Sequence, residues 1–250
     1  MKRLLEADGW EPVEVGESAT SVYRRGDVFA KCCAVSGVVE LAEERDRVRW
    51  LAGTGFPGAD LVDWQQSSDG ACLITTAVPG VAGDALPPAA HAAAMRSLGR
   101  VLRELHSLRD CPFERPLASV IATAEDVVRR DAVNPAFLTD EWRLLKPTEL
   151  LQQVVAERPY VESVLEPVVC HGDACLPNVF FDPTSLEVTG LIDVGRLGIA
   201  DRYSDLALTT IQLYDEWSAD PAPFLEAYGL PKPDPRRLHF FRLLDPLTWG

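Results

Sequence analysis

The stretch that decides the fold reads Cys170-His171-Gly172-Asp173-Ala174-Cys175-Leu176-Pro177-Asn178, and Leu191-Ile192-Asp193-Val194-Gly195-Arg196 follows it. A short apolar run precedes each block, so we expect the polar residues to lie in loops at strand ends. Asp173 or Asn178 taken singly would be read as a turn former, because both residue types favour turns. The ordered set of a carboxylate, an amide and a second carboxylate points instead to a site for a metal ion and a phosphate group.

Phosphoryl transfer requires such a set of side chains. One carboxylate orients the attacking hydroxyl and accepts its proton, while an amide and a second carboxylate hold Mg²⁺ on the nucleotide phosphates. The catalytic loop of protein kinases separates its Asp and Asn by four residues, and Asp173 and Asn178 have that spacing. We therefore predict Asp173 as the catalytic carboxylate and Asn178 and Asp193 as metal ligands.

A kinase also needs a lysine for the α- and β-phosphates and a carboxylate that fixes its ammonium group. Lys31 is a lone lysine in the strand-like run 28–33. We predict Glu44, in the helix that follows, as its partner, with Glu43 and Glu40 as rivals. The alternative for Lys31 is a surface lysine on an edge strand.

The expected phosphate loop is less distinctive. Residues 16–21 are small and polar but contain one glycine, so they do not match G-x-G-x-x-G. Backbone groups and the hydroxyl of Ser18 would then have to cover the phosphates.

Periodicity predicts two parts of different architecture. The first 80 residues suggest strands over 21–24, 28–33, 59–64 and 71–76 and a helix over 38–53; helical spacing follows near 98–105, 119–131, 139–157, 203–217 and 235–244, with short strands at 168–170, 179–181 and 188–192. We predict an α+β, protein-kinase-like bilobal fold. Residues 1–77 form an N-terminal nucleotide-binding lobe, with an antiparallel sheet and one helix. Residues 78–250 form a larger, mainly helical C-terminal lobe for catalysis and substrate binding.

Composition excludes several partners. The 250 residues contain 24 Lys and Arg and 38 Asp and Glu, a net charge of −14, which repels nucleic acid and anionic membranes and attracts a cation. Neither an apolar run of about 20 residues nor a secretion signal is evident, so we expect a cytoplasmic protein with no membrane, nucleic-acid or protein partner. We expect the six cysteines to be reduced thiols. A zinc site at Cys170, His171 and Cys175 is disfavoured, because no paired C-x-x-C completes four ligands.

At these residues the chain resembles the aminoglycoside O-phosphotransferases, bacterial antibiotic-resistance kinases with a protein-kinase-like fold. The resemblance spans nearly the whole length and includes segments 29–31, 43–46, 170–178, 190–198 and 200–207. Within the family, segments 70–73, 111–115 and 244–250 look most like the 3″-phosphotransferases that modify streptomycin. The 3′-phosphotransferases that act on kanamycin and neomycin share most core motifs, and a kinase-like binding protein without catalysis is a further alternative.

The resemblance implies an ATP-dependent kinase that uses Mg²⁺, phosphorylates the 3″-hydroxyl of streptomycin and so confers resistance. Thr76 and Val78 would lie in the hinge that binds adenine, and His171 would hold the catalytic loop. Asp201 and Asp205 would orient loops, and Asp205 could also brace the helix that follows.

The implied substrate carries two guanidinium groups and a methylamine, so its receptor should be rich in carboxylates. The expected contacts are Asp173, Arg196, Asp245 and the terminal carboxylate of Gly250; Arg196 could instead brace Asp173 or Asp205 through an ion pair. Asp215 and Glu216 are either further contacts or a solvated helix face.

Overall fold

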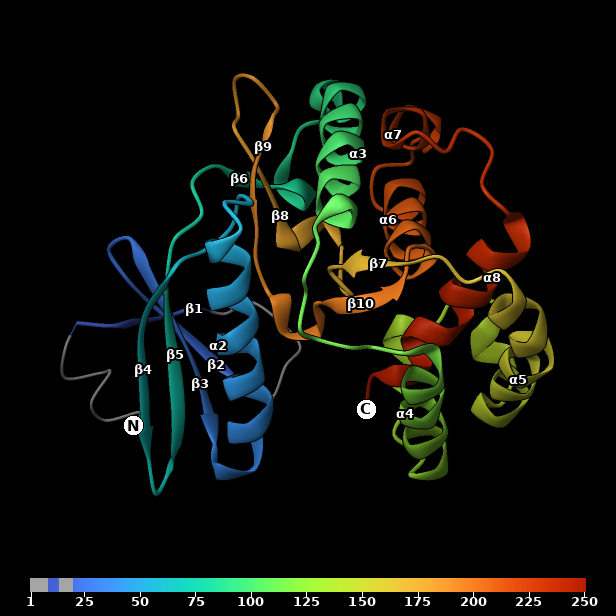
Figure 1. The fold of residues 1–250 in the computed structure, drawn as a ribbon, viewed down its shortest axis with the longest axis horizontal. Coiled ribbons are helices and arrows are strands. Elements are labelled where there is room, and N and C mark those ends of the chain that lie inside the picture. Colours follow the sequence, from blue (N-terminus) through green and yellow to red (C-terminus); the bar gives the residue numbers. More distant parts are fainter. Residues whose placement is uncertain (1–8, 14–19) are drawn as a thin grey trace. The chain divides into compact units, whose positions relative to one another are not determined.

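The computed structural model describes residues 9–13 and 20–250 (Figure 1). These residues group into two units, one with the residues up to 85 together with 177–196, and the other with residues 86–176 and 197–250. The division into lobes at residue 77 stays a prediction. The grouping by contacts differs from it in two ranges, 78–85 and 177–196, which belong to the first unit.

The first unit contains an antiparallel sheet and a helix. The strands are β1 (Glu11–Val13), β2 (Ser21–Arg25), β3 (Val28–Ala34), β4 (Leu61–Ser67) and β5 (Gly70–Thr76), in the order β1-β2-β3-β5-β4. Helix α2 (Val38–Gly53) packs on one face of the sheet through Leu41, Val48 and Leu51, while Trp10, Tyr23, Ala30 and Ile74 form a core on the other face. The predicted antiparallel sheet with one helix is confirmed.

Segment 177–196 adds a second small sheet to the first unit. It contains β8 (Val179–Phe181) and β9 (Val188–Leu191), which pair in the order β6-β8-β9 with β6 (Val81–Ala82). The N–H of Ile192 donates to the carbonyl of Asn178 at 3.0 Å. Asn178 and Asp193 are therefore held at the same end of the β8–β9 hairpin.

The second unit is mainly helical. Its helices are α3 (His91–Ser107), α4 (Leu117–Arg129), α5 (Pro147–Ser163), α6 (Tyr203–Asp215), α7 (Ala222–Tyr228) and α8 (Pro235–Leu244), and β7 (Pro167–Cys170) pairs antiparallel with β10 (Gly198–Asp201). One core of fifteen buried residues, including Ile121, Leu150, Ala207 and Phe240, joins α4, α5, α6 and α8. The predicted helical lobe is confirmed.

Two details of the second unit differ from the sequence prediction. The helix expected over 139–157 is α5, which begins at Pro147, where the missing N–H costs no hydrogen bond. The Glu149 carboxylate accepts the N–H of Lys146 at 2.8 Å and so closes that end of the helix. Helix α7 was not predicted, because its seven residues are too few to show a helical period.

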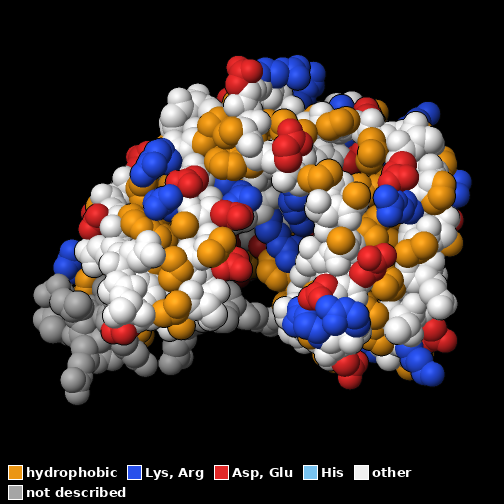
Figure 2. All heavy atoms as spheres, turned by 60° about the horizontal axis from the view of Figure 1, so that its bottom comes forward, with side chains coloured by type: hydrophobic (Ala, Val, Ile, Leu, Met, Phe, Trp, Pro, Cys, Tyr) orange, Lys and Arg blue, Asp and Glu red, His pale blue; other side chains and the backbone are white. Residues whose placement is uncertain are grey.

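None of the helices in the described part of the chain is both long and apolar enough to span a membrane. Acidic and basic side chains are both spread over the face of the molecule that Figure 2 shows, among hydrophobic and uncharged groups. The charge of −14 is thus a net excess over a surface that carries both signs.

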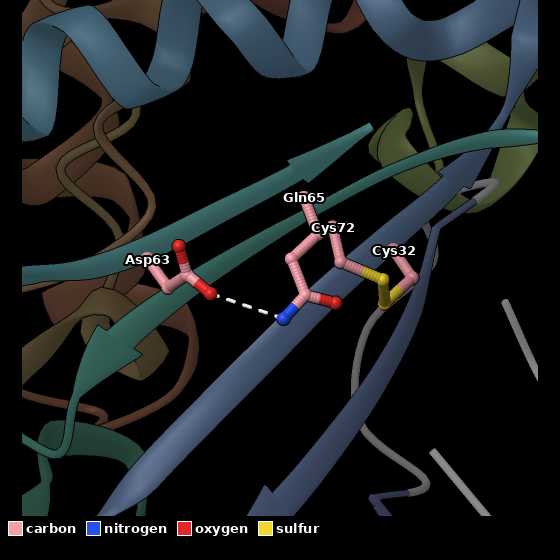
Figure 3. Close-up of a disulfide and its surroundings, with 4 residues drawn as sticks. All are labelled: Cys32, Asp63, Gln65 and Cys72. Carbon is pink, nitrogen blue, oxygen red and sulfur yellow. Dashed lines mark hydrogen bonds between the residues drawn. A yellow bond between two sulfur atoms is a disulfide. The ribbon is translucent and has the colours of Figure 1, made fainter. Parts of the chain in front are cut away.

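A disulfide joins Cys32 of β3 to Cys72 of β5 (Figure 3). The two residues are direct partners in the β3–β5 ladder, with 4.2 Å between their Cα atoms. The expectation of six reduced thiols is therefore wrong for this pair, whereas Cys33, Cys111, Cys170 and Cys175 are not part of a disulfide. Forty positions separate the two cysteines in sequence, so only the strand pairing reveals them as neighbours.

Reducing the disulfide should destabilise the first unit. A crosslink that closes a loop of 40 residues lowers the conformational entropy of the unfolded chain by an amount worth roughly 4 kcal/mol. We expect dithiothreitol to shift urea unfolding, followed by Trp fluorescence, to lower denaturant, and the thiol count of the denatured protein to rise from four to six. Cys33→Ser should keep this sensitivity to dithiothreitol, whereas Cys32→Ser/Cys72→Ser should lose it; six free thiols without reductant would contradict the disulfide.

Candidate active site

Lys31 is the centre of an ion cluster in the first unit. Its Nζ lies 2.8 Å from Oε2 of Glu44 and 3.0 Å from Oδ1 of Asp193. Residues alternate across a strand, so Lys31 faces the α2 side of the sheet while Ala30 and Cys32 face the core. Of the three glutamates considered, Glu44 forms the bond, whereas Glu43 pairs with Arg47 and Glu40 is exposed.

The cluster shifts the pKa values of Lys31 and Glu44. Burial by itself would lower the pKa of Lys31, but the carboxylates of Glu44 and Asp193 outweigh it and raise that pKa above its usual range. Burial raises the pKa of Glu44, and the ammonium group of Lys31 opposes this shift. Lys31 is thus a permanent cation, anchored on one side and able to neutralise a bound anion.

The predicted metal ligands lie at one end of the β8–β9 hairpin. Asp193 is in the left-handed backbone region with φ +58°, and its side chain is 45% exposed, while Asn178 is buried. Gly195, two residues later, lies against Glu44, and a Cβ at this position would be 3.5 Å from Oε2 of Glu44. The donor set of carboxylate and amide oxygens is the kind that Mg²⁺ binds.

Asp173 lies in the loop that follows β7 in the second unit. The loop is fixed by the buried carboxylate of Asp205, whose Oδ2 accepts the N–H of His171 at 2.7 Å and whose Oδ1 accepts the N–H of Gly172 at 2.8 Å. His171 is fully buried, and its Nδ1 accepts the N–H of Asp173 at 3.2 Å. Helix α6 therefore determines where the half-exposed Asp173 is presented.

Asp201 anchors the start of the same helix. Its carboxylate accepts the N–H groups of Tyr203 and Glu166, at 2.8 and 2.9 Å, and two bonds from Arg237 at 2.8 and 2.6 Å. The loop-orienting role expected of Asp201 and Asp205 is confirmed. Arg237 was missed, because a single arginine in a helix carries no signal of a buried partner 36 positions away.

A pocket of about 210 Å³ opens in the second unit next to the loop that carries Asp173. Gly172, the residue before Asp173, lines it, together with the acidic residues Glu114 and Asp245. Asp245 begins the C-terminal turn Asp245–Thr248, and its Oδ2 accepts the indole N–H of Trp249 at 3.4 Å. Gly250 is exposed and lies near α4, where its carbonyl accepts a 3.5 Å bond from Arg130.

The remaining predicted residues are distributed as follows. Thr76 ends β5, Val78 is buried just after it, and Arg196 ends a short turn that packs on α2, all in the first unit. Ser18 lies outside the described residues. The first unit thus brings together Lys31, Glu44 and Asp193, and the second holds Asp173, Asp245 and Gly250.

An anchored lysine on an antiparallel sheet, together with an Asp and an Asn that are separated by four residues in sequence, defines a kinase-like phosphotransferase. The chain belongs to the phosphotransferase enzyme family, whose sequence profile matches residues 9–241. It is 45% identical to the streptomycin 3″-kinase of Streptomyces griseus, over 96% of this chain and 93% of that protein.

Two further comparisons agree with this assignment. The structure of the aminoglycoside phosphotransferase APH(3″)-Id from Streptomyces rimosus, in complex with ADP and streptomycin, matches with a TM-score of 0.91 and 39% identity, over 100% of this chain and 97% of that one. An aminoglycoside 3′-phosphotransferase from Streptomyces fradiae is 35% identical over 98% of this chain and 97% of that protein. The kinase-like fold and the family membership are therefore shown.

Replacing Glu44 should cost far more stability than replacing its neighbour. Glu44→Ala leaves the Lys31 ammonium with only the more exposed Asp193 as partner, and breaking a buried ion pair typically costs about 3–5 kcal/mol. Glu43→Ala removes an exposed carboxylate of the same helix and should change stability by no more than about 0.5 kcal/mol. Urea titrations of both variants measure the difference, and equal midpoints would show that the Lys31–Glu44 pair carries no stability.

Proposed function

We propose that the protein transfers the γ-phosphoryl group of ATP to the 3″-hydroxyl of streptomycin and thereby confers resistance to this antibiotic. The observation that carries the proposal is the 45% identity to a streptomycin 3″-kinase over nearly the whole chain. The complete set of Lys31, Glu44, Asp173, Asn178 and Asp193 supports it. A catalytically inactive, kinase-shaped binding protein would not need all five.

The first unit would bind the nucleotide. Lys31, held by Glu44, would contact the α- and β-phosphates, and Ser18 would cover them. The N–H groups of Thr76 and Ala77 already donate to the carbonyls of Asp60 and Asp27, at 2.9 and 2.8 Å. Adenine recognition at this hinge would therefore use the carbonyl of Thr76 and the N–H of Val78.

Asn178 and Asp193 would hold Mg²⁺, which fits their oxygen donors and their placement at one end of the β8–β9 hairpin. The ion, when bound, neutralises charge on the β- and γ-phosphates. Asp193 also contacts Lys31, so the same carboxylate would connect the metal site to the phosphate lysine.

Asp173 would orient the 3″-hydroxyl of the substrate and accept its proton. The hydroxyl oxygen forms a bond to the γ-phosphorus as the bond between this phosphorus and the β,γ-bridging oxygen breaks, and ADP leaves. Because bond breaking runs ahead in a loose transition state, Asp173 would act mainly by positioning the hydroxyl. No covalent phosphoenzyme is needed.

The second unit would bind the cationic antibiotic. Asp245 lines the pocket beside the catalytic loop, and the carboxylate of Gly250, together with Arg196, would complete the contacts. The net charge of −14 would favour the approach of a polycation. A cytoplasmic location is proposed with this function, because ATP is available there.

The 3′-phosphotransferase reaction on kanamycin or neomycin is the second candidate, since a 3′-phosphotransferase is 35% identical over nearly the full length. Incubation of the protein with ATP and each antibiotic, followed by phosphorus and proton NMR of the product, distinguishes the two. Phosphate on the 3″-oxygen of streptomycin supports the proposal, whereas turnover of kanamycin alone would replace it.

Asp173→Ala should lower kcat for streptomycin by about three orders of magnitude, because the hydroxyl loses both its orientation and its proton acceptor. The affinity for ATP, measured by calorimetry, should stay within about two-fold, since no nucleotide contact is assigned to Asp173. Undiminished turnover by this variant would remove Asp173 from the catalytic role.

Asp245→Asn should raise the KM for streptomycin about ten-fold with little change in the KM for ATP, because one carboxylate facing a guanidinium group is lost. Asp69→Asn, in the exposed β4–β5 turn, removes the same charge and serves as the control for long-range electrostatics. Equal effects of the two substitutions on KM would mean that Asp245 contributes only to the overall field.

A further inference from the structure

Tyr228, His106 and Asp205 form a buried hydrogen-bonded chain that ends at the catalytic loop. The Tyr228 hydroxyl lies 2.7 Å from Nδ1 of His106, and Nε2 of His106 lies 3.0 Å from Oδ2 of Asp205. The three side chains come from α7, α3 and α6, and all three residues are buried. Asp205 in turn accepts the N–H groups of His171 and Gly172, next to Asp173.

Tyr228 and Asp205, the two hydrogen-bond partners of His106, constrain the tautomer of its imidazole ring. Both oxygens of Asp205 accept backbone N–H groups, from His171 and Gly172, so the carboxylate is an acceptor toward Nε2 of His106 as well. Burial raises the pKa of Tyr228 to about 12, so its hydroxyl keeps a proton to donate. A neutral imidazole that carries its hydrogen on Nε2 satisfies both neighbours at once.

Close packing of α3 and α7, which lie side by side in Figure 1, brings the tyrosine into reach. A Cβ on Gly99 of α3 would lie 2.4 Å from the carbonyl of Phe224 and 2.9 Å from the backbone N of Tyr228. Gly99 precedes His106 by seven residues, two helical turns, so both face α7. Gly99 thus allows α3 and α7 to pack closely, and this close packing brings the Tyr228 hydroxyl within hydrogen-bond distance of His106.

A metal site is the rival interpretation of this cluster, because His106, Cys170 and Asp205 offer ligand atoms within 4.8 Å of one another. Both ring nitrogens of His106 are already engaged, however. Burial raises the pKa of the Cys170 thiol, which donates to the carbonyls of Ala200 and Asp201, whereas a metal ligand must be a thiolate. Hydrogen bonds therefore engage both ring nitrogens of His106, both oxygens of Asp205 and the Cys170 thiol without an ion.

We propose that Tyr228 and His106 are positioning residues for phosphoryl transfer: Tyr228 holds His106 as the neutral Nε2–H tautomer, and His106 keeps Asp205 aligned on the catalytic loop. The inference rests on the proposed kinase function, because its kinetic consequence is the placement of Asp173. Helix α7 thus contributes to the reaction through His106 and Asp205.

The tautomer is tested directly by long-range proton–nitrogen NMR of the histidine side chains, which separates Nε2–H, Nδ1–H and imidazolium forms. The chain has four histidines, and His106→Gln identifies the signal of His106 by its loss. We expect Nε2–H at pH 7.5. An imidazolium or an Nδ1–H form would overturn the proposal, and the result does not depend on the substrate.

The kinetic test compares His106→Gln with His106→Leu. A glutamine can donate its amide N–H to Asp205 and accept from Tyr228 through its oxygen, so it reproduces the neutral tautomer and should keep kcat within about three-fold. Leucine can do neither and should lower kcat about 100-fold, with the KM for ATP within about two-fold. A glutamine variant as impaired as the leucine variant, or a leucine variant with full kcat, would overturn the proposal.

Tyr228→Phe is the milder probe if the leucine variant does not fold. We expect kcat to fall about three- to ten-fold, because one hydrogen bond is lost. Tyr160→Phe removes another tyrosine hydroxyl bond, to Asp234 in the same unit, and should leave kcat unchanged. Equal kcat for both variants would make Tyr228 merely structural.

Inactivity of the unmodified protein on streptomycin would instead refute the proposed function.

Discussion

The buried carboxylate of Asp205 is the constraint on which the catalytic loop depends. An ion with no exposed surface is tolerated only where hydrogen bonds replace its hydration, and here two backbone N–H groups and an imidazole provide them. The requirement works in both directions. The anion needs the loop in one conformation, and the loop, which contains Gly172 in the left-handed region at φ +82° directly before Asp173, is held in that conformation by the anion. Positioning of the reacting groups is a large part of what a protein contributes to phosphoryl transfer, and the contacts of Asp205 fix the backbone next to Asp173.

The Lys31 cluster solves the opposite problem in the first unit. A cation that is to meet phosphate groups must be fixed yet accessible, and Lys31 has one buried partner, Glu44, and one exposed partner, Asp193. The strand register places Lys31 on the α2 side, and segment 177–196 brings Asp193 to it from 162 positions away. The partner that anchors Lys31, Glu44, is therefore close to it in sequence, whereas the exposed partner, Asp193, comes from a distant part of the chain.

The sequence predicted those parts of the fold and site whose cause is local. The period-two runs of the sheet, the helix over 38–53 and the offset between Asp173 and Asn178 are all visible within a few residues, and a lysine in an apolar strand followed by a glutamate-rich helix indicated the Lys31–Glu44 pair. The missed features are long-range. The Cys32–Cys72 bridge depends on strand register, and Tyr228 meets His106 across 122 positions because two helices approach at a glycine. Local sequence patterns do not indicate contacts between residues that are this far apart in the chain. The catalytic, metal-binding and substrate-binding roles stay predictions, for Asp173, Asn178, Asp193, Arg196, Asp245 and Gly250.

The return of segment 177–196 to the first unit has a consequence for how relatives of this protein can be recombined. The chain enters the first unit twice, so a single crossover near residue 85 would exchange Lys31 and Glu44 but leave Asn178 and Asp193 behind. In such a chimaera, Lys31 from one parent would have to pair with Asp193 from the other, although these two side chains come from different sequences. Exchanging the whole unit needs three junctions, at about 85, 177 and 196. The first unit therefore cannot be exchanged as one continuous piece of sequence, because residues 86–176 of the second unit lie between its two parts.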